Sequence, residues 1–221
     1  MRPTASFRWP ATLALAALAT SFAPAHAGEV YGGIGLPGAM LGYAQPINSG
    51  FTLRGDFATL GSRSIDRDEE GIRYTGTGKL QRLGVFADWF VLGGGFRLTG
   101  GLTSNDASLK LTAGGNGASI NIGGTTYPTT PADRLDVTIK YPSAMPYFGV
   151  GYGHQLSGTG LGFVLDFGVA VGKPKVTATT QGPSLGQVSQ ADLDRELQEL
   201  RDGVASVKVL PQVSLGVSYR F

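Results

Sequence analysis

Charged residues interrupt several segments of the chain that are otherwise apolar or rich in glycine. In FTLRGDF, residues 51–57, and GLGFVLDFGVAV, residues 160–171, the charges alternate with large apolar side chains. Alternate side chains of a strand face opposite sides, so these charges would share one face with small residues. Charges removed from water must pair, and a row of them can seal a narrow space or line a polar path. The candidates for this interior network are Arg54, Asp56, Arg82, Asp88, Arg97, Asp166, Lys208 and Arg220.

A second group of acidic residues has the spacing of metal ligands. Asp66, Asp68 and Glu70, with Gly71 after them, match the opening of an EF-hand calcium loop. The match then fails, because Thr77 stands where the bidentate acid belongs and strands are expected on both sides. We favour a solvated acidic loop and keep these carboxylates as a weak cation candidate. No other metal or cofactor is predicted.

The segments that must position these charges are strands with a two-residue period. Connections between them alternate between tight, glycine-marked turns and long segments, as in bacterial outer-membrane barrels. The predicted strands are 29–36, 39–47, 51–61, 79–91, 96–104, 144–155, 161–176 and 207–221. The short connections are 37–38, 48–50, 93–95 and 157–160, and the long ones are 62–78, 105–143 and 177–206.

The two faces of these strands differ in a way that decides between a soluble and a membrane barrel. One face carries large apolar residues, such as Leu161, Phe163 and Leu165, and the other carries mostly glycine, alanine and serine. In a soluble barrel, the row of side chains that faces water would be rich in Lys, Glu and Thr. Small residues suit the crowded interior of a narrow barrel instead. We therefore predict an all-β, eight-stranded antiparallel up-and-down transmembrane β-barrel with apolar side chains outside.

Aromatic residues near the tight turns are expected to form a girdle at one membrane interface. The chain closes on VSLGVSYRF, residues 213–221, in which apolar residues alternate up to a final phenylalanine. The predicted girdle consists of Phe51, Trp89, Phe96, Tyr152, Phe163, Tyr219 and Phe221.

The N-terminal residues predict export. Arg2 and Arg8 precede an apolar run at 11–19, and Ala25-His26-Ala27 forms a cleavage site, which together make a signal peptide over residues 1–27. Residues 28–221 then form one barrel domain with equal numbers of basic and acidic residues, which gives no reason to expect a nucleic-acid partner. The chain has no cysteine, which excludes disulfides and thiolate sites.

The C-terminal pattern is similar to the signal by which outer-membrane proteins are recognised. GLGFVLDFGVAVGKPKV at 160–176, VLPQVSLGVSYRF at 209–221, and LGYAQPI with FTLRG within 41–55 resemble a family of small Gram-negative outer-membrane barrels of the OmpA or OmpW type. The resemblance implies a fold, a location in the outer membrane, and recognition of Phe221 by the barrel-insertion machinery. It implies no activity.

The last long connection contains one predicted helix. In SQADLDRELQELRDGV, residues 189–204, an apolar stripe of Leu193, Leu197, Leu200 and Val204 recurs at helical spacing. We expect this helix outside the membrane, as a cap packed on the barrel mouth. A helix that binds a partner is the alternative.

Three functions follow from different features. We favour a plugged, monomeric barrel whose long external loops contact surface partners or lipopolysaccharide. A narrow channel or solute carrier would use the interior charges. A lipid-modifying enzyme would need His154, the only histidine in residues 28–221, with a serine such as Ser157 nearby. Its place near the tight turns differs from the outer-leaflet sites of such enzymes, so we do not expect an enzyme.

Overall fold

The computed structural model describes residues 28–221 except 70–71, 116, 155–157 and 205–207. Eight antiparallel strands form a closed ring in which each strand pairs with its neighbours and the last pairs with the first. The ring consists of β1 (Glu29–Gly35), β2 (Gly38–Asn48), β3 (Phe51–Glu69), β4 (Ile72–Trp89), β5 (Phe96–Gly114), β9 (Ala144–Tyr152), β10 (Gly160–Val171) and β12 (Val209–Arg220). The predicted barrel is confirmed, and residues 29–48 form a hairpin of two strands.

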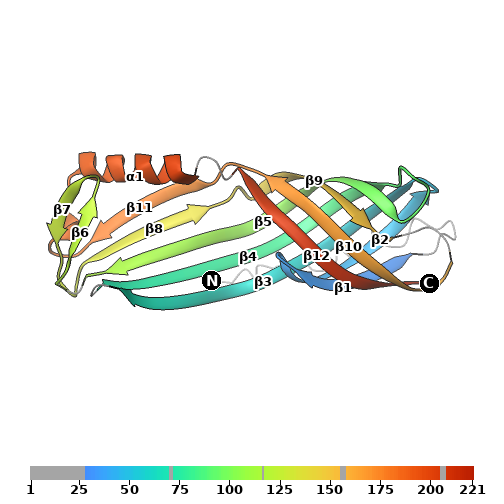
Figure 1. Ribbon diagram of the computed structural model, residues 1–221, viewed down its shortest axis with the longest axis horizontal. Coiled ribbons are helices and arrows are strands. Elements are labelled where there is room, and N and C mark those ends of the chain that lie inside the picture. The colour runs from blue at the N-terminus through green and yellow to red at the C-terminus, as the bar shows by residue number, and fades with distance from the viewer. Residues whose placement is uncertain (1–27, 70–71, 116, 155–157, 205–207) are drawn as a thin grey trace, which may run out of the picture.

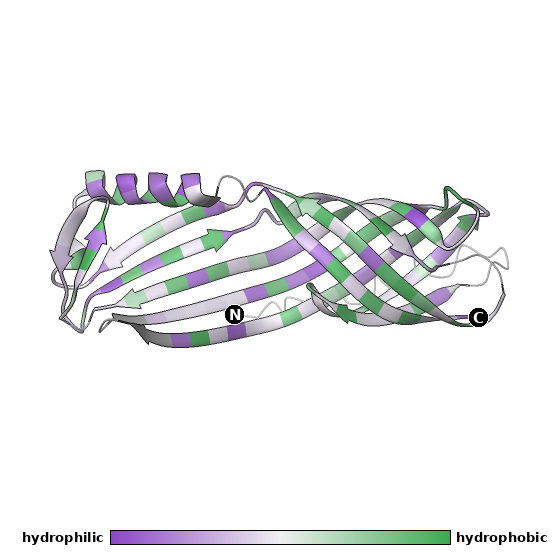
Figure 2. Ribbon diagram, in the orientation of Figure 1, coloured by the Kyte–Doolittle hydropathy of each residue, from purple (hydrophilic) through white to green (hydrophobic). Residues whose placement is uncertain are grey.

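The alternation of side chains closely follows the predicted faces. In β12, Gln212, Ser214 and Ser218 are buried, whereas Leu215 and Val217 on the other face are exposed. Large apolar side chains lie on the outer surface of the ring. In Figure 2 the hydrophobic residues appear as green bands that alternate with paler or purple bands along the strands of the ring. A closed ring suits a lipid environment, because it leaves no strand edge with unpaired backbone groups. The exposed apolar side chains on its outer surface suit contact with lipid as well.

No helix within the described residues is long and apolar enough to span a membrane.

The barrel has two unlike ends. At the turn end, 49–50 and 90–95 connect neighbouring strands, and β12 finishes there (Figure 1). At the loop end, β3, β4 and β5 continue far beyond the ring, with β3 paired to β4 as far as Glu69 opposite Ile72. The prediction of loops at 62–78 and at the start of 105–143 is therefore wrong. These residues keep a two-residue period but lack the large apolar row, so their sequence indicates a loop although the backbone remains paired.

The strands beyond the ring belong to a folded unit, which we call the extension. It comprises the outer parts of β3, β4 and β5 with four further strands, a 3₁₀ turn and one helix. These elements are β6 (Ser119–Ile122), β7 (Thr125–Pro128), β8 (Arg134–Lys140), β11 (Lys175–Gln181), η2 (Leu185–Gln187) and α1 (Gln190–Val204). β8 pairs with β5, and β11 forms the edge of this sheet.

The predicted helix is α1, and its apolar stripe is covered. Leu197 is buried against β8, β11 and the β6–β7 hairpin, and Leu193 and Leu200 pack beside it. Figure 1 shows α1 over the extension, beside β11 and away from the ring. The expectation of a cap on the barrel mouth is therefore corrected. The apolar row Val176 and Ala178 on β11 gives this stripe a partner outside the ring.

Asp133 ties the loop before β8 to the segment before α1. Its carboxylate accepts hydrogen bonds from the backbone amides of Thr130 (2.7 Å), Ser184 (2.9 Å) and Leu185 (2.9 Å), and from the Thr130 hydroxyl (2.7 Å). Burial raises the pKa of Asp133, but these donors outweigh it and hold that pKa well below its ordinary value of 3.8. The charged carboxylate thus organises the outer end of the extension, where β8 begins and β11 ends.

This depressed pKa predicts acid sensitivity of the extension. Asp133 stabilises the folded form fully above about pH 4, and that contribution is lost as the pH falls below the ordinary carboxyl pKa toward the lower folded value. Asp133→Asn should lower hydrogen-exchange protection of the Ser184 and Leu185 amides about tenfold at neutral pH and remove the acid dependence. Asp136→Asn, which alters a partly exposed carboxylate on β8, is the matched control. Equal protection in both variants would refute this role.

Candidate functional site in the barrel interior

The structure places most of the predicted interior charges inside the ring. Seven of the eight have relative exposures of 9% or less; they are Arg54, Asp56, Arg82, Asp88, Arg97, Asp166 and Arg220. Lys208 is the exception, and its assignment to the interior is corrected. It precedes β12, whose pairing with β10 ends at Val209 opposite Val171, so its exposed side chain lies beyond the wall.

Two arginines and two aspartates form the middle layer of the interior. Arg54 from β3 contacts Asp88 through Nε (2.5 Å) and Nη2 (3.2 Å), and its Nη2 also reaches Asp166 on the opposite wall (3.2 Å). Arg97 lies between the same two carboxylates, with Nη1 2.9 Å from Asp166 and 3.3 Å from Asp88. The Thr99 hydroxyl donates to Asp88 at 2.7 Å. The charges are therefore paired across the full width of the lumen.

A second layer lies nearer the loop end. Arg82 donates to Asp56 (2.6 Å) and to the Gln212 side chain, and Asp56 also accepts from the Tyr31 hydroxyl (3.2 Å). The Phe86 ring lies between the guanidinium carbons of Arg82 and Arg54, which are 5.3 and 5.2 Å from its centroid. Such placement allows the ring face to attract both cations.

An apolar layer packs beside these charges, with residues from β4, β9 and β10. Phe86 packs edge-on against Tyr147 with ring centroids 5.0 Å apart, and Met145 and Ala170 complete this buried cluster. The space between the charged and apolar layers is a cavity of about 10 Å³, which holds at most one water molecule. The described interior is therefore filled by side chains.

A third layer, at the turn end, contains an acid that the sequence interpretation missed. Glu29 is 2% exposed and accepts from Arg220 Nε (3.2 Å) and Nη2 (2.8 Å). His154 Nδ1 lies 2.5 Å from the other Glu29 oxygen, and its ring meets Tyr31 edge-on at 4.5 Å. Its signal in the sequence is weak, because only the two-residue spacing from Tyr31 places Glu29 on the inner face of β1. The described lumen thus holds four arginines and four carboxylates.

Glycines on neighbouring strands make room for the large interior groups. A Cβ on Gly151 would lie 2.5 Å from the Arg97 guanidinium, so any side chain there would force the guanidinium to shift. Three other pairs show the same close approach, so a side chain at these places would displace a large interior group from its packed position. They are Gly42 with Tyr31 and Gly168 with Tyr147 on neighbouring strands, and Gly84 with Phe86 on the same strand, β4.

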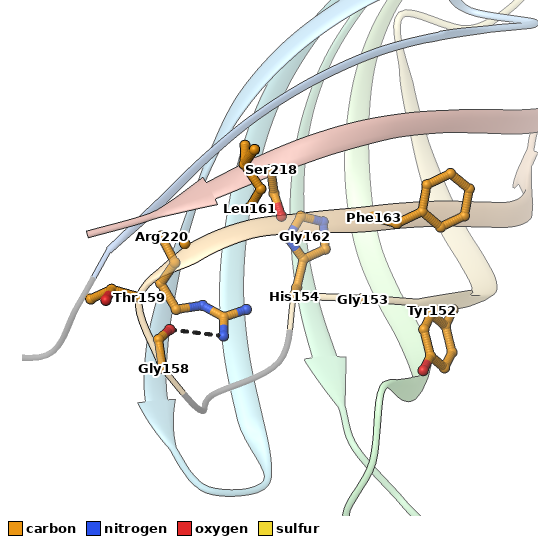
Figure 3. Close-up of a pocket in the computed structure, with 11 residues that line it drawn as sticks. Tyr152, Gly153, His154, Gly158, Thr159, Leu161, Gly162, Phe163, Ser218 and Arg220 are labelled. Atoms are coloured by element: carbon orange, nitrogen blue, oxygen red, sulfur yellow. Dashed lines mark hydrogen bonds between the residues drawn. The ribbon is translucent and has the colours of Figure 1, made fainter.

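A pocket of about 210 Å³ opens beside the third layer, between the end of β9 and the start of β10 (Figure 3). The β9–β10 ladder stops at Tyr152, because Gly153 and His154 adopt left-handed conformations with φ of 99° and 59°. A left-handed histidine costs of order 1–3 kcal/mol and directs its ring into the barrel. Its Nε2 atom is buried and has no hydrogen-bond partner within the described structure.

The remaining predicted residues lie outside this interior. All seven predicted girdle aromatics have exposed side chains near the turn end, and Phe51 stacks on Trp89 at 6.2 Å. Asp66 and Asp68 lie on β3, where their backbones pair with Thr75 and Arg73, so this part of the acidic segment is extended strand rather than a calcium loop. Glu70 and Ser157 fall outside the described residues.

The closed ring, its apolar surface and its charged filling define a small transmembrane β-barrel of the outer-membrane class. The crystal structures of Acinetobacter baumannii CarO2 and CarO have this fold. CarO2 matches with a TM-score of 0.61 and 20% identity over 88% of this chain and 98% of its own. CarO matches with a TM-score of 0.58 and 16% identity over 89% and 97%. No family model and no curated protein matches the sequence.

The paired interior predicts that Asp88→Asn destabilises the barrel by about 3–5 kcal/mol, because Arg54 and Arg97 lose a buried counter-ion. Unfolding by urea in micelles can be followed by Trp89, the only tryptophan in residues 28–221. Asp106→Asn is the matched control, since it breaks an exposed ion pair with Lys79 and should cost about 1 kcal/mol or less. Similar losses in the two variants would contradict a structural network.

Proposed function

We propose that this protein is a sealed outer-membrane barrel that holds the extension at the cell surface for contact with other surface components. The observation that carries the proposal is the interior, where paired charges and an apolar layer leave a cavity of about 10 Å³. A narrow eight-stranded ring has room only for its own side chains. The proposed role therefore lies outside the lumen.

Orientation follows from the unlike ends. Short turns face the periplasm and longer connections face outward in barrels of this class, which puts the turn end in the periplasm and the extension outside. Phe221, just after β12 at the turn end, would serve as the signal for the barrel-insertion machinery. Because the ring is closed and the stripe of α1 is covered, we propose a monomer.

Lipopolysaccharide is the surface component that the charge at the loop end favours. Lys140 and Lys175 stand directly opposite each other on β8 and β11, an arrangement of like charges that is unfavourable without an anion. Lys173 lies beside them along the chain, and Lys208 is joined to this region because its carbonyl accepts from the Gly172 amide (2.8 Å). In the described structure, no carboxylate lies within 4 Å of these four ammonium groups. Lipopolysaccharide phosphates would supply the missing negative charge.

A sealed lumen predicts that residues 28–221, refolded into a planar bilayer, give no reproducible conductance steps. The current should stay at the level of the bare membrane because the charged and apolar layers block the lumen. Folding is checked on the same sample by comparing its gel migration before and after boiling, and a difference between the two shows that the unboiled protein is folded. Steps that change in size with Arg82→Ala or Asp88→Ala would overturn the proposal in favour of a channel.

The lysine group predicts weaker binding of lipopolysaccharide when two of its charges are removed. Lys140→Ser with Lys175→Ser should reduce affinity roughly tenfold to thirtyfold, at about 1 kcal/mol for each charge near an anionic surface. Lys79→Ser with Lys110→Ser removes the same charge from ion-paired lysines and is the matched control. Binding is measured by calorimetry with purified and with dephosphorylated lipopolysaccharide. Equal binding of the two lipids by the unaltered protein would exclude phosphate recognition.

A further inference from the structure

The sheet of the extension has an apolar face that is covered only in part. This face continues the lumen of the ring, because inner and outer side chains alternate along β5 without interruption. Val137 on β8 is buried in the core beneath α1, whereas Leu109 on β5 and Ile65 on β3 are exposed on the same face. Figure 1 shows α1 beside β11, away from the outer part of β3. The face is therefore open at β3, β4 and β5.

A cavity of about 340 Å³ lies on this open face, where the extension meets the ring. Leu80, Leu109 and Ile139 line it. Tyr141 and Leu210 separate it from the lumen, because both line the cavity and pack on the apolar layer of the interior. A lining of this kind suits the hydrocarbon part of a ligand, and the volume, near the lower end for small-ligand sites, suits a chain of medium length.

Arg63 on β3 lies next to this cavity. Its backbone pairs with Gly78 on β4, and Gly78 pairs with Leu109, so the three residues share one face. A Cβ on Gly78 would meet no atom within 4 Å, which leaves open space between Arg63 and Leu109. Two strand spacings, about 10 Å, separate the backbones of these two residues. An extended arginine side chain and a small head group can bridge that distance.

The charge of Arg63 has no counter-ion. Its side chain is exposed, and within the described residues no carboxylate lies within 4 Å of its guanidinium. Lys79 also borders the cavity, but its ammonium pairs with Asp106 at 2.6 Å. The described side chains that β4, β5 and β8 contribute to this face are uncharged. One free cation beside an apolar cavity is complementary to a hydrocarbon chain that ends in one acidic group.

The direction in which the cavity opens indicates where such a chain comes from. The cavity lies on the face that continues the lumen, whereas membrane lipids contact the opposite, outer surface of the ring. A lipid of the bilayer would have to leave it to place a chain here. A free amphiphile with a single chain reaches the cavity from solution.

We propose that this cavity binds a free fatty acid of medium chain length, with its chain between Leu80, Leu109 and Ile139 and its carboxylate accepting hydrogen bonds from Arg63. The proposal goes beyond the surface contact proposed above and does not depend on it. Neither the lysines opposite each other on β8 and β11 nor the charged layers of the lumen line the cavity. Binding of lipopolysaccharide and conductance are therefore separate results.

The test detects the ligand inside the cavity. Residues 28–221, with protonated leucine and isoleucine methyl groups, are placed in nanodiscs of deuterated phospholipid and titrated with dodecanoic acid. Nuclear Overhauser effects are expected from the chain to the methyl groups of Leu80, Leu109 and Ile139. Contacts only with Leu102, which is 68% exposed on the outer face of β5, would mean that the acid merely dissolves in the bilayer, and would overturn the proposal.

The same experiment with protonated phospholipid and no fatty acid identifies the source of the chain. Contacts with Leu102 and none with the cavity are expected, because the phospholipid stays in the bilayer. Contacts of phospholipid with Leu80 and Leu109 would assign the cavity to bilayer lipid instead. No contact with the cavity from either molecule would also overturn the proposal.

Arg63→Gln tests recognition of the head group. It should weaken binding of dodecanoic acid about tenfold, because a charge-assisted hydrogen bond is lost, and leave binding of dodecanol unchanged. Arg134→Gln is the matched control, since it removes an exposed arginine from the opposite face of β8. Equal losses of the acid in both variants, or equal losses of acid and alcohol in Arg63→Gln, would contradict recognition of the carboxylate.

Gly78→Leu tests the open space between Arg63 and the cavity. Its side chain should fill that space and abolish binding of the acid. Gly100→Leu is the matched control, because a Cβ there also meets no atom within 4 Å and Gly100 lies on the outer face of β5. Gel migration before and after boiling shows whether each variant is folded. Equal binding by the two folded variants would place the ligand elsewhere and overturn the site.

Discussion

The pairing of every buried charge inside the ring is the constraint on which this structure depends. Arg97 is completely buried and carries a charge that cannot be left without compensation, so Asp88 and Asp166 must approach it from two strands. Asp88 lies on β4 and Asp166 on β10, on different parts of the barrel wall. The distance between these two strands is therefore limited by the lengths of the Asp88, Arg97 and Asp166 side chains. The diameter of the barrel and the side chains that fill it must therefore match each other.

This constraint also explains the small residues of the chain. Long arginine and aromatic side chains fill the lumen only if the strand beside them presents no Cβ, as at Gly151 against Arg97. The outer face is free of that restriction and carries the large apolar residues that lipid favours. Beyond the ring the restriction ends, and the same strands continue as a sheet with its own core around Leu197 and Val176.

Local periodicity was enough to predict the ring but not the extension. The alternation in β10 and β12 is strong because one face of each strand contacts lipid and the other faces the packed lumen. The same alternation of side chains predicts which charged residues point into the lumen. Outside the membrane both faces of β3 and β4 meet water, so the pattern weakens while the backbone ladder persists. Glu29 was missed because a single acid near the start of a short strand gives little pattern. The pocket could not be predicted, since it depends on left-handed backbone at Gly153 and His154.

The span of these pairs along the chain sets the order in which the barrel can assemble. Arg54 and Asp166 are 112 positions apart, and Glu29 and Arg220 are 191 positions apart. The β3–β4 hairpin pairs Arg54 with Asp88 and Arg82 with Asp56 by itself, whereas Arg220 and Asp166 find their partners only when strands far apart in the sequence meet. Closure between β1 and β12 therefore completes the charge pairing, and we expect the search for that long-range contact to be slow. A barrel filled in this way has a complete interior only when its first and last strands have met.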